Sequence, residues 1–213
     1  MKKIIAVAIA AFTMVASTFA LDFSVGAKAI VGTNFGANED ISEELAGRTA
    51  NKDTAYDFGG SVYANFALLG SLGVQGEINI INSSITFKDG VDTADYSSLN
   101  LDIPVMLWLN LDLWKLTVGF GVGVNFNSEL AQFSDAKNLT KDSFTVGLAA
   151  GADVKFFVTN HVGIVASARF ICEFERKDVP ITIAGYDTGA GYPTIAYPRR
   201  SLYGGLGVEW KFF

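Results

Sequence analysis

The sequence predicts an all-β fold, a single eight-stranded antiparallel up-and-down β-barrel that occupies residues 21–213. Three observations predict it. Apolar side chains alternate with small or polar ones in eight segments after residue 21, which is the period of a β-strand and not of a helix. The connections between these segments are alternately long and short. No stretch after the N-terminus reaches the roughly 18 consecutive apolar residues that a spanning helix needs.

The alternation is clearest in "LTVGFGVGVNFN", residues 116–127. Every second residue from Leu116 is bulky and apolar, whereas the residues between them are glycine, threonine or asparagine. One face of this strand is therefore broad and the other almost bare. The eight predicted strands are 22–35, 56–69, 72–80, 99–111, 116–127, 144–156, 162–175 and 201–212.

The lengths of the connections predict the topology. About twenty residues link the first two strands, the turn "GSLG" links the next two, a loop of about ten residues is expected between the third and fourth, and about twenty residues precede the last strand. We therefore expect all long loops at one end of the barrel. The short turns and both termini are expected at the other end.

Residues 1–20 have the pattern of a secretory signal peptide. Lys2 and Lys3 precede the apolar run 4–15, and "STFA" supplies small residues for cleavage after Ala20. An uncleaved anchor helix is the alternative, which the shortness of the apolar run disfavours. We expect an exported protein.

Charge and cysteine content exclude several classes of protein. Of the 16 lysines and arginines, 14 remain after the leader is removed, against 22 acidic residues, so the mature charge is −8. Such a surface repels nucleic acid. Cys172 is the only cysteine, so no intrachain disulfide can form.

The size of the side chains predicts which face of the barrel is inside. The interior of an eight-stranded barrel is barely wide enough for its own side chains, so the small and polar set is expected inside and the bulky set outside. A soluble barrel would then expose far more than the few hundred Å² of apolar surface that soluble monomers tolerate. A lipid bilayer would cover that surface, and closure satisfies every backbone polar group, as lipid demands. The sequence thus predicts a transmembrane barrel with outer-membrane lipid as its solvent.

Three stretches resemble parts of a known superfamily. "LDIPVMLWLNL", "FFVTNHVGIVASARF" and the closing "YGGLGVEWKFF" are similar to pieces of small eight-stranded outer-membrane barrels of the OmpA/OmpX/OmpW-like, opacity-type superfamily. The resemblance covers the chain from about residue 21 and implies location in a bacterial outer membrane. It also implies that the aromatic last strand is read by the barrel-assembly machinery. These barrels usually end in an outward phenylalanine, whereas here Phe212 is in phase and Phe213 is not.

Four charged residues are expected inside the barrel near mid-height. They are Lys28, Glu77, Asp102 and Arg169. One interpretation is a salt-bridged plug that compensates buried charge, and the other is an ion-selective constriction. The narrow bore favours the plug.

The other candidate sites lie on the loops and in strand 99–111. The last loop carries a mixture of tyrosine and arginine that is typical of recognition surfaces, and packing over the barrel mouth is the alternative. Its predicted surface consists of Tyr186, Tyr192, Tyr197, Arg199 and Arg200. Pro104 cannot donate to the ladder, so a bulge or local gap is expected there. Some OmpW-like barrels, which this feature resembles, are thought to pass small apolar molecules sideways into the bilayer.

Enzyme chemistry is not predicted. The only histidine, His161, lies in a short turn rather than near the long loops, and no His/Cys cluster has metal-ligand spacing. The acidic group at residues 39–44 could contact Ca²⁺, but "DISE" fits a helix capping box better. We expect no catalytic residue, metal or cofactor.

The sequence therefore predicts a structural or surface-interacting role through long extracellular loops, with an extracellular ligand or host surface as the possible partner. A narrow channel for small hydrophobic solutes is the alternative. An exported soluble lipid-binding barrel is a third hypothesis.

Overall fold

The structure is a computed structural model, and it describes residues 22–34, 51–69, 71–89, 92–132, 144–174, 179–180, 194–195 and 199–212. The predicted signal peptide and Phe213 lie outside these residues. No helix among them is long and apolar enough to cross a membrane.

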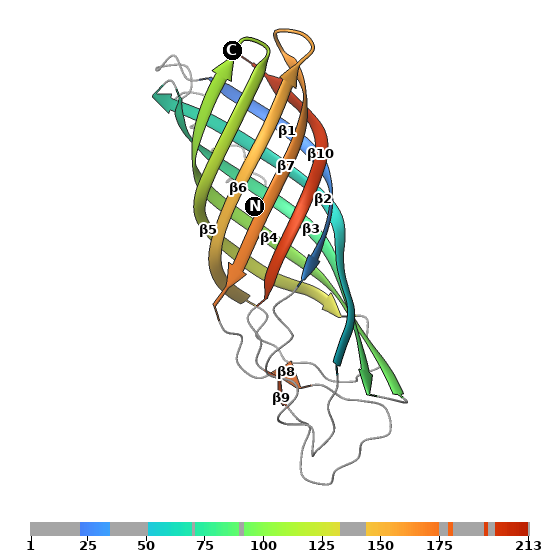
Figure 1. The fold of residues 1–213 in the computed structure, drawn as a ribbon. Helices are drawn as coiled ribbons and strands as arrows, with labels where there is room; N and C mark the ends of the chain where they lie inside the picture. The colour runs from blue at the N-terminus through green and yellow to red at the C-terminus, as the bar shows by residue number, and fades with distance from the viewer. Residues whose placement is uncertain are drawn as a thin grey trace, which may run out of the picture.

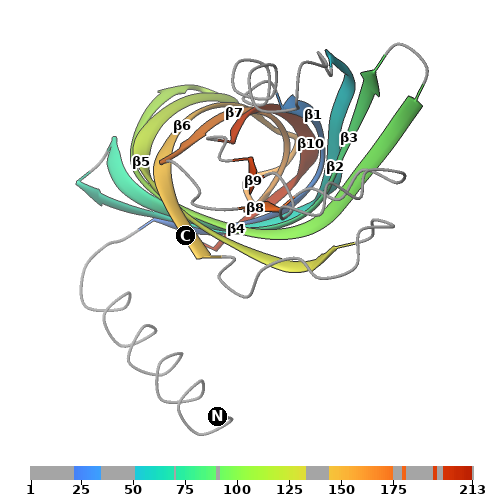
Figure 2. The same ribbon diagram turned by 90° about the horizontal axis from the view of Figure 1, so that it is seen from below.

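Eight antiparallel strands form a closed barrel, as predicted (Figures 1 and 2). The order around the barrel is β1-β10-β7-β6-β5-β4-β3-β2. Each barrel strand pairs with the next barrel strand along the chain, with β8 and β9 lying between β7 and β10, and β1 closes on β10. A separate two-stranded pair, β8 and β9, lies in the last long connection. The bounds are β1 Phe23–Asn34, β2 Asn51–Leu69, β3 Leu72–Asp89, β4 Asp92–Leu113, β5 Leu116–Gln132, β6 Phe144–Phe157, β7 Val162–Glu173, β8 Val179–Pro180, β9 Thr194–Ile195 and β10 Arg200–Lys211.

The two ends of the barrel differ as the connection lengths predict. The short turns β2–β3, β4–β5 and β6–β7 lie at one end together with the end of β10, and β8 and β9 lie beyond the other (Figure 1). One expectation was wrong. The loop of about ten residues expected between the third and fourth strands is replaced by continued pairing, down to Asp89 opposite Asp92. β3 and β4 remain paired with each other beyond the long-loop end of the barrel, and only residues 90 and 91 separate them.

Most of the bulky apolar side chains that the structure describes face outward. On β5, Phe120 and Val122 are 50% and 66% exposed, whereas the asparagines Asn125 and Asn127 are completely buried. The same alternation holds on β1, where Val31 is 68% exposed and Lys28 is 5% exposed. The predicted orientation of the strands is confirmed for the described residues.

The interior also holds large apolar side chains, which the expectation of a small and polar filling did not include. Trp108 is fully buried, and its ring occupies the space beside Gly119 and Gly121. A Cβ atom added at Gly121 would lie 1.9 Å from Cε3 of Trp108. In the same way, the ring of Tyr63 fills the space at Gly26. The bare face of β5 therefore leaves room for an indole ring contributed by β4.

The ladder between β3 and β4 is interrupted at Pro104. Gly76 pairs with Val105 and Asn79 pairs with Asp102, but the two positions between them on each strand are not paired. The register is the same on both sides of the interruption. Pro104 therefore leaves a local gap without a bulge, because it has no N–H group to donate.

Candidate functional site

Buried charged side chains fill the bore on the side of the short turns. Glu77 Oε1 lies 3.1 Å from Lys28 Nζ and accepts a 2.9 Å hydrogen bond from Arg169 Nε. A second contact joins Arg169 Nη2 to the same carboxylate oxygen. Arg169 Nη1 also donates to Asp153 Oδ1 at 2.7 Å. These contacts join β1, β3, β6 and β7 across the lumen, because each side chain belongs to the inward phase of its strand.

A second set of contacts extends this network toward the short turns. Lys155 Nζ lies 2.7 Å from Glu209 Oε2, which accepts a 2.6 Å hydrogen bond from the Tyr63 hydroxyl. The ammonium group of Lys28 lies 4.7 Å from the centroid of the Tyr63 ring, within cation–π range. We call the combined network the inner cluster, and it consists of Lys28, Tyr63, Glu77, Asp153, Lys155, Arg169 and Glu209.

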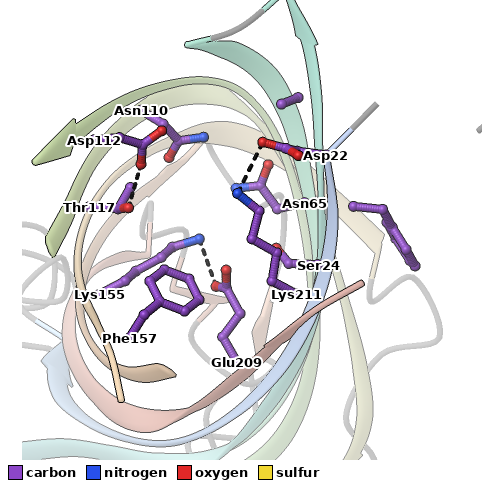
Figure 3. A pocket seen from close by; sticks show the side chains of 12 residues that line it. Asp22, Ser24, Asn65, Asn110, Asp112, Thr117, Lys155, Phe157, Glu209 and Lys211 are labelled. Atoms are coloured by element: carbon purple, nitrogen blue, oxygen red, sulfur yellow. Dashed lines mark hydrogen bonds and ion pairs between the residues drawn. The ribbon is translucent and has the colours of Figure 1, made fainter. Parts of the chain in front are cut away.

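The short-turn mouth of the barrel is polar and nearly filled. A cavity of about 40 Å³ lies there, and Figure 3 shows Lys155 and Glu209 on one side of it and Lys211 with Asp22 on the other. Lys211 Nζ lies 3.1 Å from Asp22 Oδ2, but both side chains are partly exposed. The cavity has room for a few water molecules.

An apolar layer crosses the bore above the inner cluster. Along β7 the inward side chains follow the order Arg169, Ile171 and Glu173, and Ile171 is completely buried between the two charged residues. Its neighbours in the layer come from β1, β3, β4, β6 and β10. They are Ile30, Ile81, Met106, Ala149 and Tyr203, and Trp108 extends this apolar group beside the inner cluster, where the Arg169 guanidinium carbon lies 4.9 Å from its ring centroid.

A separate group of charges lies beyond this layer, toward the long connections. Arg199 Nη1 lies 3.0 Å from Asp102 Oδ1 and 3.3 Å from Glu173 Oε1, and its Nη2 lies 3.8 Å from Asp57 Oδ2. The Tyr203 hydroxyl donates to Asp102 Oδ2 at 2.9 Å. We call these five residues the outer cluster. Two asparagine side chains, Asn125 and Asn127, also donate to Asp102.

The four charges expected at mid-height do not form one group. The structure brings Lys28, Glu77 and Arg169 together but places Asp102 on the other side of the apolar layer, where Arg199 is its partner. Strand phase alone places a residue inside the barrel. Its height depends on the stagger between strands, which the pattern of side chains does not specify.

Arg199 is not on the loop surface where the sequence analysis placed it. It is 2% exposed, because the β7–β10 ladder continues one residue before β10, with the Glu173 backbone N–H donating to the Arg199 carbonyl at 2.9 Å. Residue 199 therefore has the same inward phase as Ser201 and Tyr203. Arg200 is exposed at the start of β10. The other members of the predicted surface, Tyr186, Tyr192 and Tyr197, lie outside the described residues.

Sequence reasoning missed several partners in the two clusters. The sequence did indicate that these partners point into the barrel, because each lies on the polar face of its strand. Asp57, Asp153, Lys155, Glu173, Glu209 and Tyr203 were all recognisable in this way, whereas their pairing was not.

His161 lies in the β6–β7 turn, as the sequence analysis expects. Its Nδ1 is 2.9 Å from the Lys211 carbonyl oxygen, and its ring stacks on Trp210 with centroids 6.0 Å apart. In the described part of the chain, no group of three or more His, Cys, Asp and Glu residues is arranged to hold a metal ion.

An apolar exterior, a closed ladder and a lumen filled with buried charged side chains define a transmembrane β-barrel of the bacterial outer membrane. Comparison with family models agrees with this class. The family described as "Outer membrane protein beta-barrel domain" matches residues 4–192, and the chain belongs to this family. No protein with a curated description matches the sequence.

Solved outer-membrane proteins have a similar fold. The outer membrane protein OprG from Pseudomonas aeruginosa has a TM-score of 0.65 and 14% identity, over 90% of this chain and 95% of that chain. Neisserial surface protein A (NspA) has a TM-score of 0.54 and 17% identity, over 89% and 97%. A major outer membrane protein from Thermus thermophilus has a TM-score of 0.52 and 18% identity, over 91% and 100%. At these identities the likeness establishes the fold alone.

Proposed function

We propose that the protein is a closed outer-membrane barrel with a structural or surface-interacting role, exported with cleavage of residues 1–20. The observation that carries the proposal is the filled lumen. Arg169 and Trp108 lie against each other in the bore, Arg199 lies farther toward the long connections, and none of the three is more than 2% exposed. Ligand contact would then occur through the long extracellular connections, which is where barrels of this class place their long loops.

The energetics of the inner cluster support a closed bore. Breaking a buried ion pair by removing one partner costs roughly 3 to 5 kcal/mol, because the other charge stays buried without compensation. An ion that crossed the lumen would have to separate Arg169 from both Glu77 and Asp153, and then pass the apolar layer. Steady conduction is therefore not expected of the wild-type barrel.

Planar-bilayer recording tests the closed bore. We expect wild-type protein to give no steady large conductance, under conditions in which a known porin conducts. Arg169→Ala removes the guanidinium that joins Glu77 to Asp153, so it should introduce intermittent openings, whereas Lys211→Ala at the exposed mouth should stay silent. A steady large conductance from the wild type would contradict the proposal.

The surface-interacting role is tested separately on intact cells. Cells that display the wild type are compared with cells that display the barrel with Tyr186, Tyr192 and Tyr197 all replaced by alanine, for attachment to cultured epithelial cells. We expect weaker attachment by the triple variant at equal surface amounts. Equal attachment by both would leave the loop tyrosines without this role and refute that part of the proposal.

A second candidate function is sideways passage of small apolar solutes. The gap at Pro104 favours it, because an apolar groove on the lipid-facing surface includes Gly76, Ile78 and Ile103 beside that gap. Pro104→Ala restores the missing N–H donor and should lower uptake of an apolar dye into proteoliposomes. Uptake no faster than in protein-free liposomes would exclude this function.

A further inference from the structure

The turn between β4 and β5, at the short-turn end, carries a highly exposed tryptophan. Among the large apolar side chains that the structure describes, Trp114 is the most exposed, at 92%. The turn consists of Trp114 and Lys115, and the residues on either side of it, Leu113 and Leu116, pair with each other. The Phe157 backbone N–H donates to the Lys115 carbonyl at 2.8 Å, which ties the turn to β6. The turn is therefore fixed in place while the indole ring projects from it.

The backbone of Trp114 has a conformation that tryptophan rarely adopts. Its φ is 59°, and among the described residues no other residue except glycine has a positive φ. A two-residue hairpin turn with a positive φ at its first position alone is the type II′ turn, which favours glycine at that position. A bulky residue in this region is an outlier, and the strain persists only where other interactions offset it. Tryptophan must therefore provide an interaction here that glycine cannot.

The barrel itself supplies little of that interaction. The ammonium group of Lys115 lies 5.2 Å from the centroid of the Trp114 ring, which is within cation–π range, but such a contact is weak at an exposed site. Because the ring is almost fully exposed, it buries very little apolar surface against the rest of the chain. The interaction that offsets the strain therefore lies outside the barrel.

The lipid-facing surface of β4 continues directly into this turn. The outward side chains of its last part, Leu109, Leu111 and Leu113, are all exposed, and Trp114 follows Leu113. A continuous exposed apolar surface marks a membrane or protein interface, and on β4 that surface already faces lipid. Tryptophan is enriched where hydrocarbon meets the headgroups, because its ring is apolar and its N–H group is polar. Lys115 is exposed beside it, and a lysine at this level extends its ammonium group toward the headgroups.

The position of Trp114 around the barrel also fits a membrane contact. On one wall, Phe23 of β1 lies against Phe66 of β2 and against Phe212 next to the end of β10, with ring centroids 4.7 and 5.2 Å apart. In the order of the strands, β4 and β5 lie on the wall opposite β1 and β10. The β4–β5 turn is also the only one of the three short turns whose sequence contains tryptophan, phenylalanine or tyrosine. Trp114 is thus the aromatic counterpart of the phenylalanine group on the other wall.

We propose that Trp114 and Lys115 bind the phospholipid headgroup layer of the periplasmic leaflet, which is the side on which such barrels place their short turns. The indole ring lies among the lipid ester groups, and the Lys115 ammonium contacts lipid phosphate. This contact offsets the backbone strain at Trp114 and holds the β4–β5 wall at a fixed depth in the membrane. It requires neither conduction through the bore nor a ligand at the cell surface.

Depth-dependent fluorescence quenching tests this contact in the full barrel. Wild type and Trp114→Gly are refolded in phosphatidylcholine vesicles, and the difference between their emission spectra isolates Trp114. Lipid brominated near the headgroup should quench this difference several-fold more than lipid brominated near the chain ends, and acrylamide in the water should quench it several-fold less than a free tryptophan derivative. Trp210→Phe is the control, because Trp210 lies on the lipid-facing surface of β10 and is 50% exposed, so its emission should also respond to brominated lipid. Lys115→Gln should make Trp114 more accessible to acrylamide.

Heat modifiability on gels verifies that each variant is folded in the vesicles. Glycine adopts a positive φ without strain, so Trp114→Gly is expected to fold, and Trp114→Asn replaces it if it does not, because asparagine also tolerates this region. Trp114 emission that no brominated lipid quenches and that acrylamide quenches fully would overturn the proposal, and would place the turn in periplasmic water, where a protein partner could bind it. Strongest quenching by bromine near the chain ends would overturn the headgroup contact. Equal acrylamide accessibility in Lys115→Gln and the wild type would remove Lys115 from the contact.

Discussion

A single methyl group added at Gly121 would strike the ring of Trp108. The added Cβ atom would lie 1.9 Å from Cε3 and 2.3 Å from Cζ3 of the indole, whereas carbon atoms in contact stay about 3.5–4.0 Å apart. Gly76 provides a matched control on the lipid-facing side, because a Cβ atom there would meet nothing within 4 Å. The two glycine-to-alanine changes therefore differ only in what lies beside them.

The structure gives the indole ring little freedom to move. Trp108 is fully buried, and the guanidinium carbon of Arg169 lies 4.9 Å from its ring centroid. Overpacking a rigid core costs about 1 to 3 kcal/mol, so we expect Gly121→Ala to lower the free energy of unfolding by about 3 kcal/mol, the upper part of that range. Gly76→Ala should leave it unchanged or raise it by about 0.4 to 1 kcal/mol, because alanine restricts the unfolded chain.

Urea titration of the refolded barrel in lipid vesicles measures the difference, with the SDS-resistant band on unboiled gels as the probe of folding. The unfolding midpoint should fall for Gly121→Ala at an unchanged slope. Adding Trp108→Leu should recover part of the loss relative to the sum of the single changes, because the two sites are in contact. Equal unfolding midpoints for Gly121→Ala and Gly76→Ala would refute the explanation that the glycines of β5 make room for the Trp108 ring.

Three further changes probe other parts of the barrel by the same titration. Tyr63→Phe removes the hydroxyl that donates to Glu209 at 2.6 Å, and it should cost about 1.5 to 3 kcal/mol, as expected for a hydrogen bond to a charged group. Lys211→Ala removes a partly exposed ion pair with Asp22 and should cost less than about 1 kcal/mol; a larger loss than for Tyr63→Phe would contradict this ranking. Val122→Lys places a charge on the lipid-facing surface and should cost roughly 2 to 4 kcal/mol, so a stability equal to the wild type would argue against the assigned orientation.

The architecture could be predicted because it depends on local patterns. Two-residue alternation identified the strands, and the size of the alternating side chains placed Phe120 outside and Asn125 inside. The length of β3 and β4 beyond the barrel wall was missed. Polar residues near the rim interrupt the apolar alternation there, although backbone pairing continues to Asp89 and Asp92.

The composition of the clusters could be predicted only in part. Lys28, Glu77 and Arg169 were expected together and lie together in the structure, but Arg199 was assigned to the loop surface. The tyrosine-rich loop next to it concealed that residue 199 continues the inward phase of β10. The alternation of β10 could have shown that Arg199 points inward, whereas the sequence holds no information that pairs it with Asp102.

The sequence by itself determined the strands, their direction and the side that each residue faces, because side chains alternate with a period of two whatever the neighbouring strands do. Only the tertiary structure decided which inward residues meet. Arg169 and Glu77 are 92 positions apart, and their contact depends on how far each strand is staggered against the next when the barrel closes. That stagger comes from hydrogen bonding around the whole barrel, and it is also what separates the inner cluster from the outer cluster.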